Sequence, residues 1–590
     1  MRFPSIDLLA ARAAAVLRRF PLTILVATVA AAAGIAAIDG DREHIWTRLA
    51  FVAALGLPAT IGLTLLGEVR GWRAPARLAA PALAIVLLAL FFFAWPGMEE
   101  KHDAIRYLQL SAALHLAVAF LPFLGAADSN AFWQYNRRLF LGFLRAGVFS
   151  AVLFVGIAIA LAALDKLFGV EIESETYARI WMVVALVVNT WIFLASVPED
   201  VPALAADTEY PRALKVFTQY ILTPLAFTYL VLLLAYLVKL VGGAEWPSGW
   251  IGWLVASVAV TGLLGFLLVH PLRTDPEEGW IRIYARWLFV GLVPAAVMLL
   301  VAFAKRIAPY GLTEPRVLGV VLGVWLLGIA LWFTVRPGAS IRTIPVSLSV
   351  ILLLTLFGPV SLTSISLGSQ SRRLADNLAT AATSDSAARE ASAALRFLLD
   401  HEAAGAIESA VGKPLPPVDW DSLPRYGERR DSLGSRIMAL AGARYTEEYR
   451  STGETGGFYM NADRGGAVQV SGFDWMVPIS SNMMGPRDST RPSTVAVPPA
   501  GADSIAATYD SAGIARLVIG TDTLSFDLGT LARRYVDSIP LRGAIAAAKL
   551  QLDTTVGTRR ARLAIEGMGG TRMGPSLRVE HWNGWLLVGR

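Results

Sequence analysis

The sequence predicts a polytopic α-helical membrane domain of about 11 spans, followed by a small soluble α+β domain. Of its 590 residues, 55% are hydrophobic and 17% are charged, whereas about a quarter of a soluble protein is charged. Apolar runs separated by short charged loops fill residues 1–366, and Gly, Ser, Thr, Asp and Arg are frequent in residues 367–590. The composition therefore excludes an ordinary soluble enzyme and divides the chain into two domains.

The distribution of charge supports this division. Residues 1–366 hold 27 Lys+Arg and 22 Asp+Glu, and residues 367–590 hold 25 and 24, which together give the total of 52 and 46. The basic residues flank apolar runs instead of forming one basic face, so they predict membrane orientation and no nucleic acid partner. The chain has no cysteine, which excludes disulfides, thiolate nucleophiles and cysteine-based metal sites.

Eleven runs are long and apolar enough to cross a bilayer, since a spanning helix needs roughly 20 mostly apolar residues. They are Pro21 to Ile38, Trp46 to Leu66, Leu78 to Trp95, Tyr107 to Leu124, Leu141 to Leu164, Ile180 to Ala195, Thr218 to Val241, Trp250 to Val269, Trp287 to Ala304, Val317 to Val335 and Thr343 to Ile365. The segment Ile6 to Leu17 before them is expected to form an interfacial helix on the cytoplasmic side. The lipid bilayer is thus the principal predicted partner.

The orientation follows from lysines and arginines in alternate loops. If the N-terminus is cytoplasmic, the inner segments hold 17 Lys and Arg and the outer loops hold 10, which favours this orientation. The outer loop with Lys305, Arg306 and Arg316 is the main exception, because it is as basic as an inner loop. Eleven spans then place residues 367–590 outside the cytoplasm.

The soluble half is expected to begin with helices and continue with strands. One or two amphipathic helices are predicted in Ser366 to Val411, and others at Ser432 to Ala443 and Leu528 to Val536. Strands are predicted at Tyr445 to Tyr449, Ala467 to Val470, Ile514 to Ile519, Ala548 to Leu552, Arg560 to Ile565, Ser576 to Val579 and Trp585 to Val588. Hairpin turns are predicted at Asp510 to Gly513 and at Asn583-Gly584, and Gly485 to Gly501 is expected to be a loop.

Several short motifs resemble one bacterial membrane-protein family. They are Arg19-Phe20-Pro21-Leu22, Tyr220-Ile221-Leu222-Thr223-Pro224-Leu225, Trp246-Pro247-Ser248-Gly249-Trp250, Tyr310-Gly311-Leu312-Thr313-Glu314, Ser369-Gln370 with Arg373-Leu374, and Gly472-Phe473-Asp474-Trp475. The family is known only as domain of unknown function 4153. The resemblance implies a polytopic bacterial membrane protein with a C-terminal soluble region, and we expect it in the cytoplasmic (inner) membrane. It implies no established reaction, so no catalytic residue is carried over.

Two polar residues within spans are candidate functional residues. His115 lies near mid-span with Ser111 one turn earlier, and Asn189 lies in the sixth span. An ionisable group inside a membrane is costly and suggests a function such as a proton relay. A neutral imidazole, or an amide, that forms an interhelical hydrogen bond is the alternative for both.

The seventh span carries the best argument for a permease. Tyr229 and Tyr236 are seven residues apart and share a helix face, and Pro224 is expected to break the hydrogen-bond ladder. Broken helices line many transporter sites, although ordinary kinked packing also explains the pattern. Trp246 and Trp250 bracket a tight turn and are expected at the membrane interface.

The remaining candidates lie in loops. Tyr310 and Glu314, near the basic residues of the same loop, are candidates for binding an anionic lipid, with a self-neutralising turn as the alternative. Asp474 marks a candidate partner-binding surface in the soluble domain. His401-Glu402 lacks the second histidine of a zinc-protease helix, so no metal, cofactor or catalytic residue is predicted.

Three functions remain open at this point. The first is a non-enzymatic envelope protein whose exported domain binds a partner or ligand. The second is a transporter, and the third is an enzyme similar to lipid-linked-sugar glycosyltransferases, which place acidic residues in the first outer loop, here Asp39 and Asp41. The substrate, the partner and the oligomeric state do not follow from the sequence.

Overall fold

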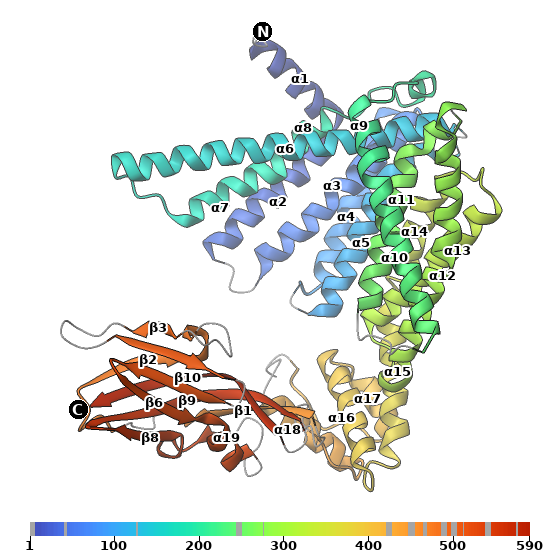
Figure 1. Ribbon diagram of the computed structural model, residues 1–590. Helices are drawn as coiled ribbons and strands as arrows, with labels where there is room; N and C mark the ends of the chain where they lie inside the picture. Colours follow the sequence, from blue (N-terminus) through green and yellow to red (C-terminus); the bar gives the residue numbers. More distant parts are fainter. Residues whose placement is uncertain are drawn as a thin grey trace. The chain divides into compact units, whose positions relative to one another are not determined.

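The chain forms two compact units, Met1–Gln370 and Ser371–Arg590, shown as a computed structural model in Figure 1. The structure describes residues 6–40, 44–98, 100–125, 128–243, 250–274, 276–420, 428–446, 455–463, 469–484, 492–496, 504–510, 513–536, 544–573 and 576–589. The first unit is helical, and the second combines helices with two β-sheets. The predicted fold class is therefore confirmed.

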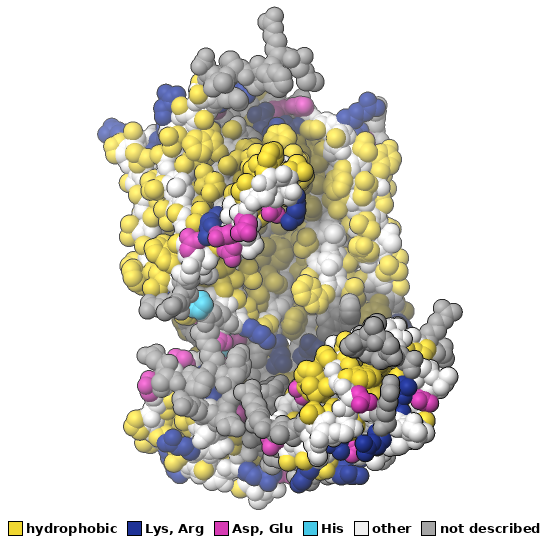
Figure 2. Space-filling view, turned by 90° about the vertical axis from the view of Figure 1, so that its left-hand side faces the viewer, with side chains coloured by type: hydrophobic (Ala, Val, Ile, Leu, Met, Phe, Trp, Pro, Cys, Tyr) yellow, Lys and Arg dark blue, Asp and Glu magenta, His cyan; other side chains and the backbone are white. Residues whose placement is uncertain are grey.

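Ten helices in the described part of the first unit are long and apolar enough to cross a membrane, and they follow the short helix α1 (Ile6–Arg19). They are α2 (Pro21–Asp39), α3 (Ile45–Val69), α4 (Ala74–Ala94), α5 (Lys101–Phe120), α6 (Ser129–Phe168), α7 (Ser174–Met182) continuing into α8 (Asn189–Leu194), α9 (Arg212–Phe217) continuing into α10 (Thr223–Val241), α11 (Trp250–Val269), α12 (Gly279–Tyr310) and α13 (Glu314–Val335). Hydrophobic side chains predominate on the face of this unit that Figure 2 shows, as lipid contact requires.

The eleventh predicted span, Thr343 to Ile365, is wrong as a single helix. The helix α14 (Thr343–Leu354) has only 12 residues, and a turn separates it from α15 (Leu362–Leu378). Gly358 adopts a φ of +75° in that turn, and the adjacent Pro359 has no backbone N–H to donate, so the helix cannot continue through it.

The broken segment nevertheless runs from one end of the helical unit to the other. The Ser349 hydroxyl donates to the carbonyl of Ala113 over 2.9 Å, and Gln109 donates to Thr355 Oγ1 over 3.1 Å, so the chain runs antiparallel to α5. After the turn, Gln370 donates to the carbonyl of Leu312 over 2.9 Å. Residue 370 thus lies beside the connection between α12 and α13.

Small residues allow the helices to approach one another closely. A Cβ added at Gly262 would stand 2.6 Å from Leu288 Cδ1, and one added at Gly291 would stand 2.8 Å from Leu230 Cδ2. Large side chains of one helix therefore fill the space left by glycines of the next, a common arrangement where lipid offers no hydrophobic driving force between helices.

The second unit begins with the end of α15 and with α16 (Asp385–Asp400), α17 (Ala404–Val411) and α18 (Glu428–Leu440). The Ser384 side chain caps α16 by accepting a hydrogen bond from the backbone N–H of Ala387. The buried alanines and leucines of α16, among them Leu395 and Leu398, recur at helical spacing. The predicted amphipathic helices are confirmed.

The two sheets enclose a common apolar core. The larger sheet has the order β2-β10-β9-β1-β7, with β8 also paired to β9, and the smaller has the order β3-β4-β5-β6. The strands are β1 (Thr455–Ala462), β2 (Trp475–Ser480), β3 (Ser493–Ala496), β4 (Ile505–Tyr509), β5 (Ile514–Ile519), β6 (Asp522–Asp527), β7 (Ala544–Ile545), β8 (Gln551–Val556), β9 (Arg559–Met573) and β10 (Ser576–Gly589). Helix α19 (Leu528–Val536) follows β6, as predicted.

Some strand-level predictions are wrong. Asn583-Gly584 is no turn: it lies inside β10, and the register against β9 shifts between the two residues. The predicted strands Ser576 to Val579 and Trp585 to Val588 are therefore one strand. Tyr445 and Thr446 are not in a strand, and the rest of that predicted strand lies outside the described residues.

Three further predictions fail in part. The predicted strand Ala548 to Leu552 begins in the short 3-10 helix Ala547–Lys549, and only its last two residues belong to β8. Residues 469 and 470 of the predicted strand Ala467 to Val470 are irregular, while its other residues lie outside the described ranges. The predicted loop Gly485 to Gly501 contains the strand β3. In contrast, the turn at Asp510 to Gly513 is confirmed in its described residues, since the Gly513 N–H donates to the carbonyl of Asp510 and Gly513 has a φ of +83°.

Candidate functional site

A cavity of about 380 Å³ brings together two of the predicted residues, His115 and Asn189. It lies among α3, α5, α6 and α8, and most of its lining is apolar. Asn136 and Thr190 are further polar residues in its wall. Pro58 of α3 also lines it, at a place where proline leaves one helix carbonyl without its usual partner.

Local hydrogen bonds fix the orientation of these side chains. His115 Nδ1 lies 2.8 Å from the carbonyl oxygen of Ser111, and because a carbonyl only accepts, Nδ1 carries the proton. Nε2 is then the nitrogen available to accept. The Ser150 hydroxyl donates to Asn189 Oδ1 over 3.3 Å, which joins α6 to α8. Asn189 thus makes an interhelical hydrogen bond, as its structural alternative expects, whereas the contact of His115 with Ser111 lies within α5.

The helix that supplies Asn189 widens just before it. Residues Val183–Val188 form a π-helical segment between α7 and α8, and such segments often accompany functional sites. A π turn closes its hydrogen bonds one residue later than an α turn, which changes the face that the following residues present. The cavity has the composition of a site for a small apolar ligand with one polar group.

A second cavity, of about 540 Å³, surrounds Pro224. Pro224 does not break its helix: residues Thr218–Leu222 adopt π geometry and α10 continues from Thr223. The aromatic residues of the wall come from the π-helical segment, α10 and α12, but Tyr229 and Tyr236 are not among the lining residues. The structure therefore separates the kink from the tyrosine face that the permease argument had joined.

Glu278 forms the polar corner of this second cavity. Its carboxylate accepts from Lys215 Nζ at 2.6 Å and from Trp280 Nε1 at 2.7 Å. The hydrogen bond from Lys215, together with that from Trp280, holds the pKa of Glu278 below its usual range despite partial burial. The sequence did not predict Glu278 as a site residue, because only its contacts with Lys215 and Trp280 distinguish it from other loop carboxylates.

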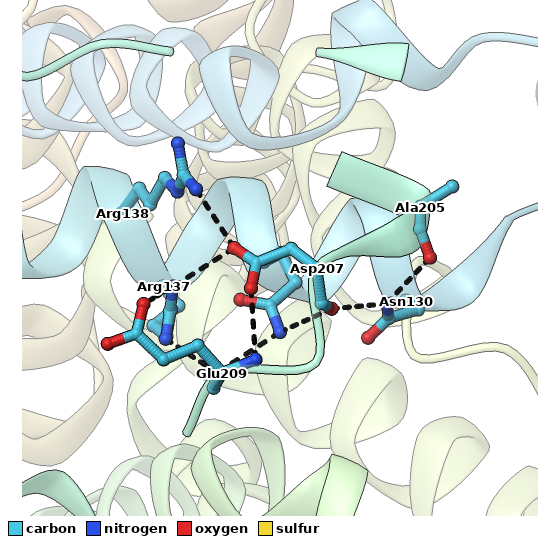
Figure 3. A network of polar contacts seen from close by, with 7 residues as sticks. Asn130, Arg137, Arg138, Ala205, Asp207 and Glu209 are labelled. Atoms are coloured by element: carbon cyan, nitrogen blue, oxygen red, sulfur yellow. Dashed lines mark hydrogen bonds and ion pairs between the residues drawn. The ribbon is translucent and has the colours of Figure 1, made fainter. Parts of the chain in front are cut away.

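A network of polar contacts joins the start of α6 to the segment before α9 (Figure 3). Arg137, whose side chain is 4% exposed, donates to the carbonyl of Glu209 over 2.6 Å and lies 3.4 Å from Asp207 Oδ2. Arg138 donates to the same carboxylate over 2.9 Å. Asn130 donates to the backbone carbonyl of Asp207 over 2.7 Å.

This network holds the segment 198–211 against α6. Burial raises the pKa of Asp207, but the N–H of Glu209, the guanidinium of Arg138 and the charge of Arg137 together outweigh burial and hold that pKa below its usual range. The signal in the sequence was a pair of arginines and a pair of acidic residues in successive predicted inner segments. Their pairing has a structural role.

A related ion-pair cluster joins helices at the end of the unit where α2 begins, here named the Arg19 end. Arg19 binds Glu68 through two nitrogens, at 3.0 and 2.8 Å, and also donates to the carbonyls of Val197 and Pro198. Arg77 adds a contact of 3.2 Å to Glu68. The family-like motif at Arg19 is thus a helix junction.

The opposite end of the unit, where α2 ends at Asp39, is named the Asp39 end. Asp39 pairs with Arg179 at 2.8 Å, so one of the two acidic residues of the glycosyltransferase alternative is neutralised, and Asp41 lies outside the described residues. Arg48 donates to the carbonyl of Phe92 at this end. These contacts join the ends of α2 and α7 and of α3 and α4 that the sequence places on one side of the membrane.

The other candidate residues do not converge on one site. The Arg316 guanidinium lies 5.6 Å from the ring centroid of Tyr310 and donates to its carbonyl, which is the structured turn that the alternative expected. Glu314 is buried in the first turn of α13. Asp474 is exposed, and its N–H donates to the carbonyl of Val588.

The two tryptophans of the turn after α10 remain untested. Trp246 lies outside the described residues, and Trp250 is the first residue of α11, although its side chain is not described. No group of three or more His, Asp or Glu side chains that could hold a metal ion occurs within the described ranges.

The fold and these contacts define a multi-pass membrane protein with a C-terminal β-sheet domain. The chain belongs to the family described as Domain of unknown function (DUF4153), whose model matches residues 22–382. It is also similar to the uncharacterized protein PM1469 of Pasteurella multocida (strain Pm70), with 24% identity over 248 residues, 41% of this chain and 40% of that protein. The chain thus matches about two fifths of this relative's length. No solved structure matches the chain.

Proposed function

We propose that this chain is an envelope protein of the bacterial cytoplasmic membrane, with a cytoplasmic N-terminus and an extracytoplasmic C-terminal domain that binds a ligand or partner. One observation carries the proposal. Gln370 binds the α12–α13 connection at Leu312, whereas Arg342, before α14, reaches the carbonyl of Phe123. The chain therefore leaves the helical unit at the Asp39 end, opposite the start of α2.

Loop contacts support this arrangement of crossings. At the Arg19 end, Arg70 donates to the carbonyl of Leu124, and Arg273 to that of Pro337. Arg70, Arg273 and Pro337 lie in predicted inner segments, and Leu124 is the last residue of the predicted span that leads into one. These segments carry the excess of Lys and Arg typical of cytoplasmic loops. The excess assigns the Arg19 end to the cytoplasm and the Asp39 end to the other side.

Cysteine labelling tests the orientation without a background, because the chain has no cysteine of its own. Thr521 is exposed between β5 and β6, and Thr208 is exposed at the Arg19 end. We expect Thr521→Cys to react with a membrane-impermeant maleimide in spheroplasts, and the matched variant Thr208→Cys to react only after permeabilisation. The opposite pattern would overturn the proposal.

Transport is the second candidate function, favoured by the cavity that His115 and Asn189 share. Histidine within a membrane span is a common element of proton relays, and His115 lines the cavity. Proteoliposomes loaded with a pH-sensitive dye would report proton flux. The candidate predicts that His115→Leu abolishes the flux and that Tyr229→Phe, outside the cavity lining, does not; equal fluxes in both variants would exclude His115 as a relay.

The glycosyltransferase-like enzyme is the weakest of the three. Its support is reduced to Asp39, whose carboxylate already binds Arg179. If Asp39→Asn and Asp41→Asn together leave the cellular phenotype unchanged, this function loses its basis.

A further inference from the structure

We propose that the outer face of the six-stranded sheet is a saccharide-binding platform, an inference that rests on the proposed function because it names the ligand of the exported domain. The platform combines ring surfaces with carboxamide and carboxylate groups. Its residues are Tyr459, Asn461, Glu566, His581, Asn583 and Trp585.

Strand register gathers these residues on one face. Tyr459 of β1 and His581 of β10 flank Gly569 of β9 from opposite sides, and Asn461 and Asn583 flank Gly567 in the same way. Residues two apart in a strand point to the same side. The four flanking side chains are all exposed, so the two rows form one continuous surface.

The glycines bring the side chains of the first row close to the sheet. A Cβ at Gly569 would stand 2.6 Å from Tyr459 Cδ2 and would also collide with the His581 ring. The two ring planes differ by 26°, and their centroids are 5.6 Å apart. The rings therefore lie across the central strand as a low aromatic surface, which a larger residue at position 569 would displace.

The second row converges over the next glycine. Asn461 Oδ1 and Asn583 Oδ1 each lie 3.0 Å from the position that a Cβ of Gly567 would occupy. Glu566 stands at the register shift between β9 and β10, where the bulge exposes its carboxylate. Asn583 Nδ2 and Trp585 Nε1 donate to its two oxygens over 3.1 and 2.7 Å. These bonds hold the polar groups in place before any ligand arrives.

This combination matches the chemistry of a sugar ring. A pyranose presents C–H groups on one side, which suit the negative face of an aromatic ring, and a rim of hydroxyls, which suit paired donors and acceptors such as Asn and Glu. Glu566 disfavours anionic ligands. A peptide that adds to a sheet binds along a strand edge, whereas the platform residues lie across the face formed by β1, β9 and β10, with β9 paired on both sides.

The test uses the full chain in nanodiscs and three soluble probes: the β-1,4-linked hexamers of N-acetylglucosamine, glucosamine and glucose. Binding is measured by saturation-transfer NMR and by titration of tryptophan fluorescence. We expect at least one hexamer to bind, and we expect Tyr459→Ala and Glu566→Gln each to weaken it about tenfold or more. The matched control is Asp553→Asn, which removes an exposed carboxylate of the same sheet that pairs with Arg562 and should leave binding unchanged.

Each outcome decides a separate point. The inference fails if no hexamer binds to the folded protein, or if Asp553→Asn weakens binding as much as Glu566→Gln. The platform side chains would then only pack over the glycines of β9. Retained binding in Tyr459→Ala and Glu566→Gln, with their thermal unfolding unchanged, also overturns it. In a further outcome, Thr521→Cys reacts only after permeabilisation while hexamers still bind and the platform variants weaken that binding. This result would reject the exported location of the domain but support the saccharide site.

Discussion

Replacing Asp207 with alanine should destabilise the helical unit by about 3 kcal/mol, mainly by leaving Arg137 without its carboxylate. Breaking a buried ion pair by removing one partner costs roughly 3–5 kcal/mol. The Arg137 side chain is 4% exposed, but in the variant it would still donate to the carbonyl of Glu209, which lies 2.6 Å away. The expected cost is therefore at the lower limit of that range. Arg138 is 41% exposed, so its contact adds only about 0.5 kcal/mol.

The assay is unfolding of the purified protein in mixed micelles, titrated with sodium dodecyl sulfate and followed by tryptophan fluorescence. Glu209→Gln is the matched control, since the Glu209 carboxylate is 73% exposed and lies 3.8 Å from Arg137, and we expect it to cost about 0.5 kcal/mol or less. Equal stability of Asp207→Ala and Glu209→Gln would refute the reasoning that Arg137 depends on Asp207.

Three other predictions concern single groups. The pKa of Asp207 is held below its usual range, so its contribution to stability should be complete above about pH 4 and lost as pH falls through the lower folded-state pKa; Asp207→Asn should flatten this part of an unfolding profile against pH. Tyr135→Phe removes a buried hydroxyl that donates to the carbonyl of Val118 over 2.9 Å and should cost about 1 kcal/mol in the same titration; no loss would mean that the bond is energetically neutral. Gly584→Ala should destabilise the C-terminal domain more than Gly569→Ala in thermal unfolding, because a Cβ at 584 meets backbone of the neighbouring strand whereas one at 569 meets two exposed rings; the reverse order would contradict this steric argument.

The sequence was sufficient for the ten long spans because hydrophobic length alone decides whether a helix can cross a bilayer. It failed for the eleventh, where average hydropathy concealed the turn at Gly358 and Pro359. Several strand predictions also failed, because alternating apolar and polar residues do not reveal which other segment a strand pairs with. Asn583-Gly584 favours a turn in isolation, but pairing with β9 keeps it in a strand.

The candidate site was predictable only in part. His115 and Asn189 stood out as polar residues in apolar spans, but their common cavity depends on the packing of four helices. Glu278 resembled any loop carboxylate until Lys215 and Trp280 were found beside it. The platform residues had no motif, because their closest neighbours are on other strands.

The sequence by itself determined that this is a membrane protein with a separate C-terminal domain, since burial in lipid or in water depends on the composition of each segment. Only the tertiary structure decided how the crossings connect and which side chains meet. Tyr459 and His581 are separated by more than a hundred residues in the chain, and they become neighbours because β1 and β10 both pair with β9. Long-range strand pairing sets such contacts, and no local pattern encodes them.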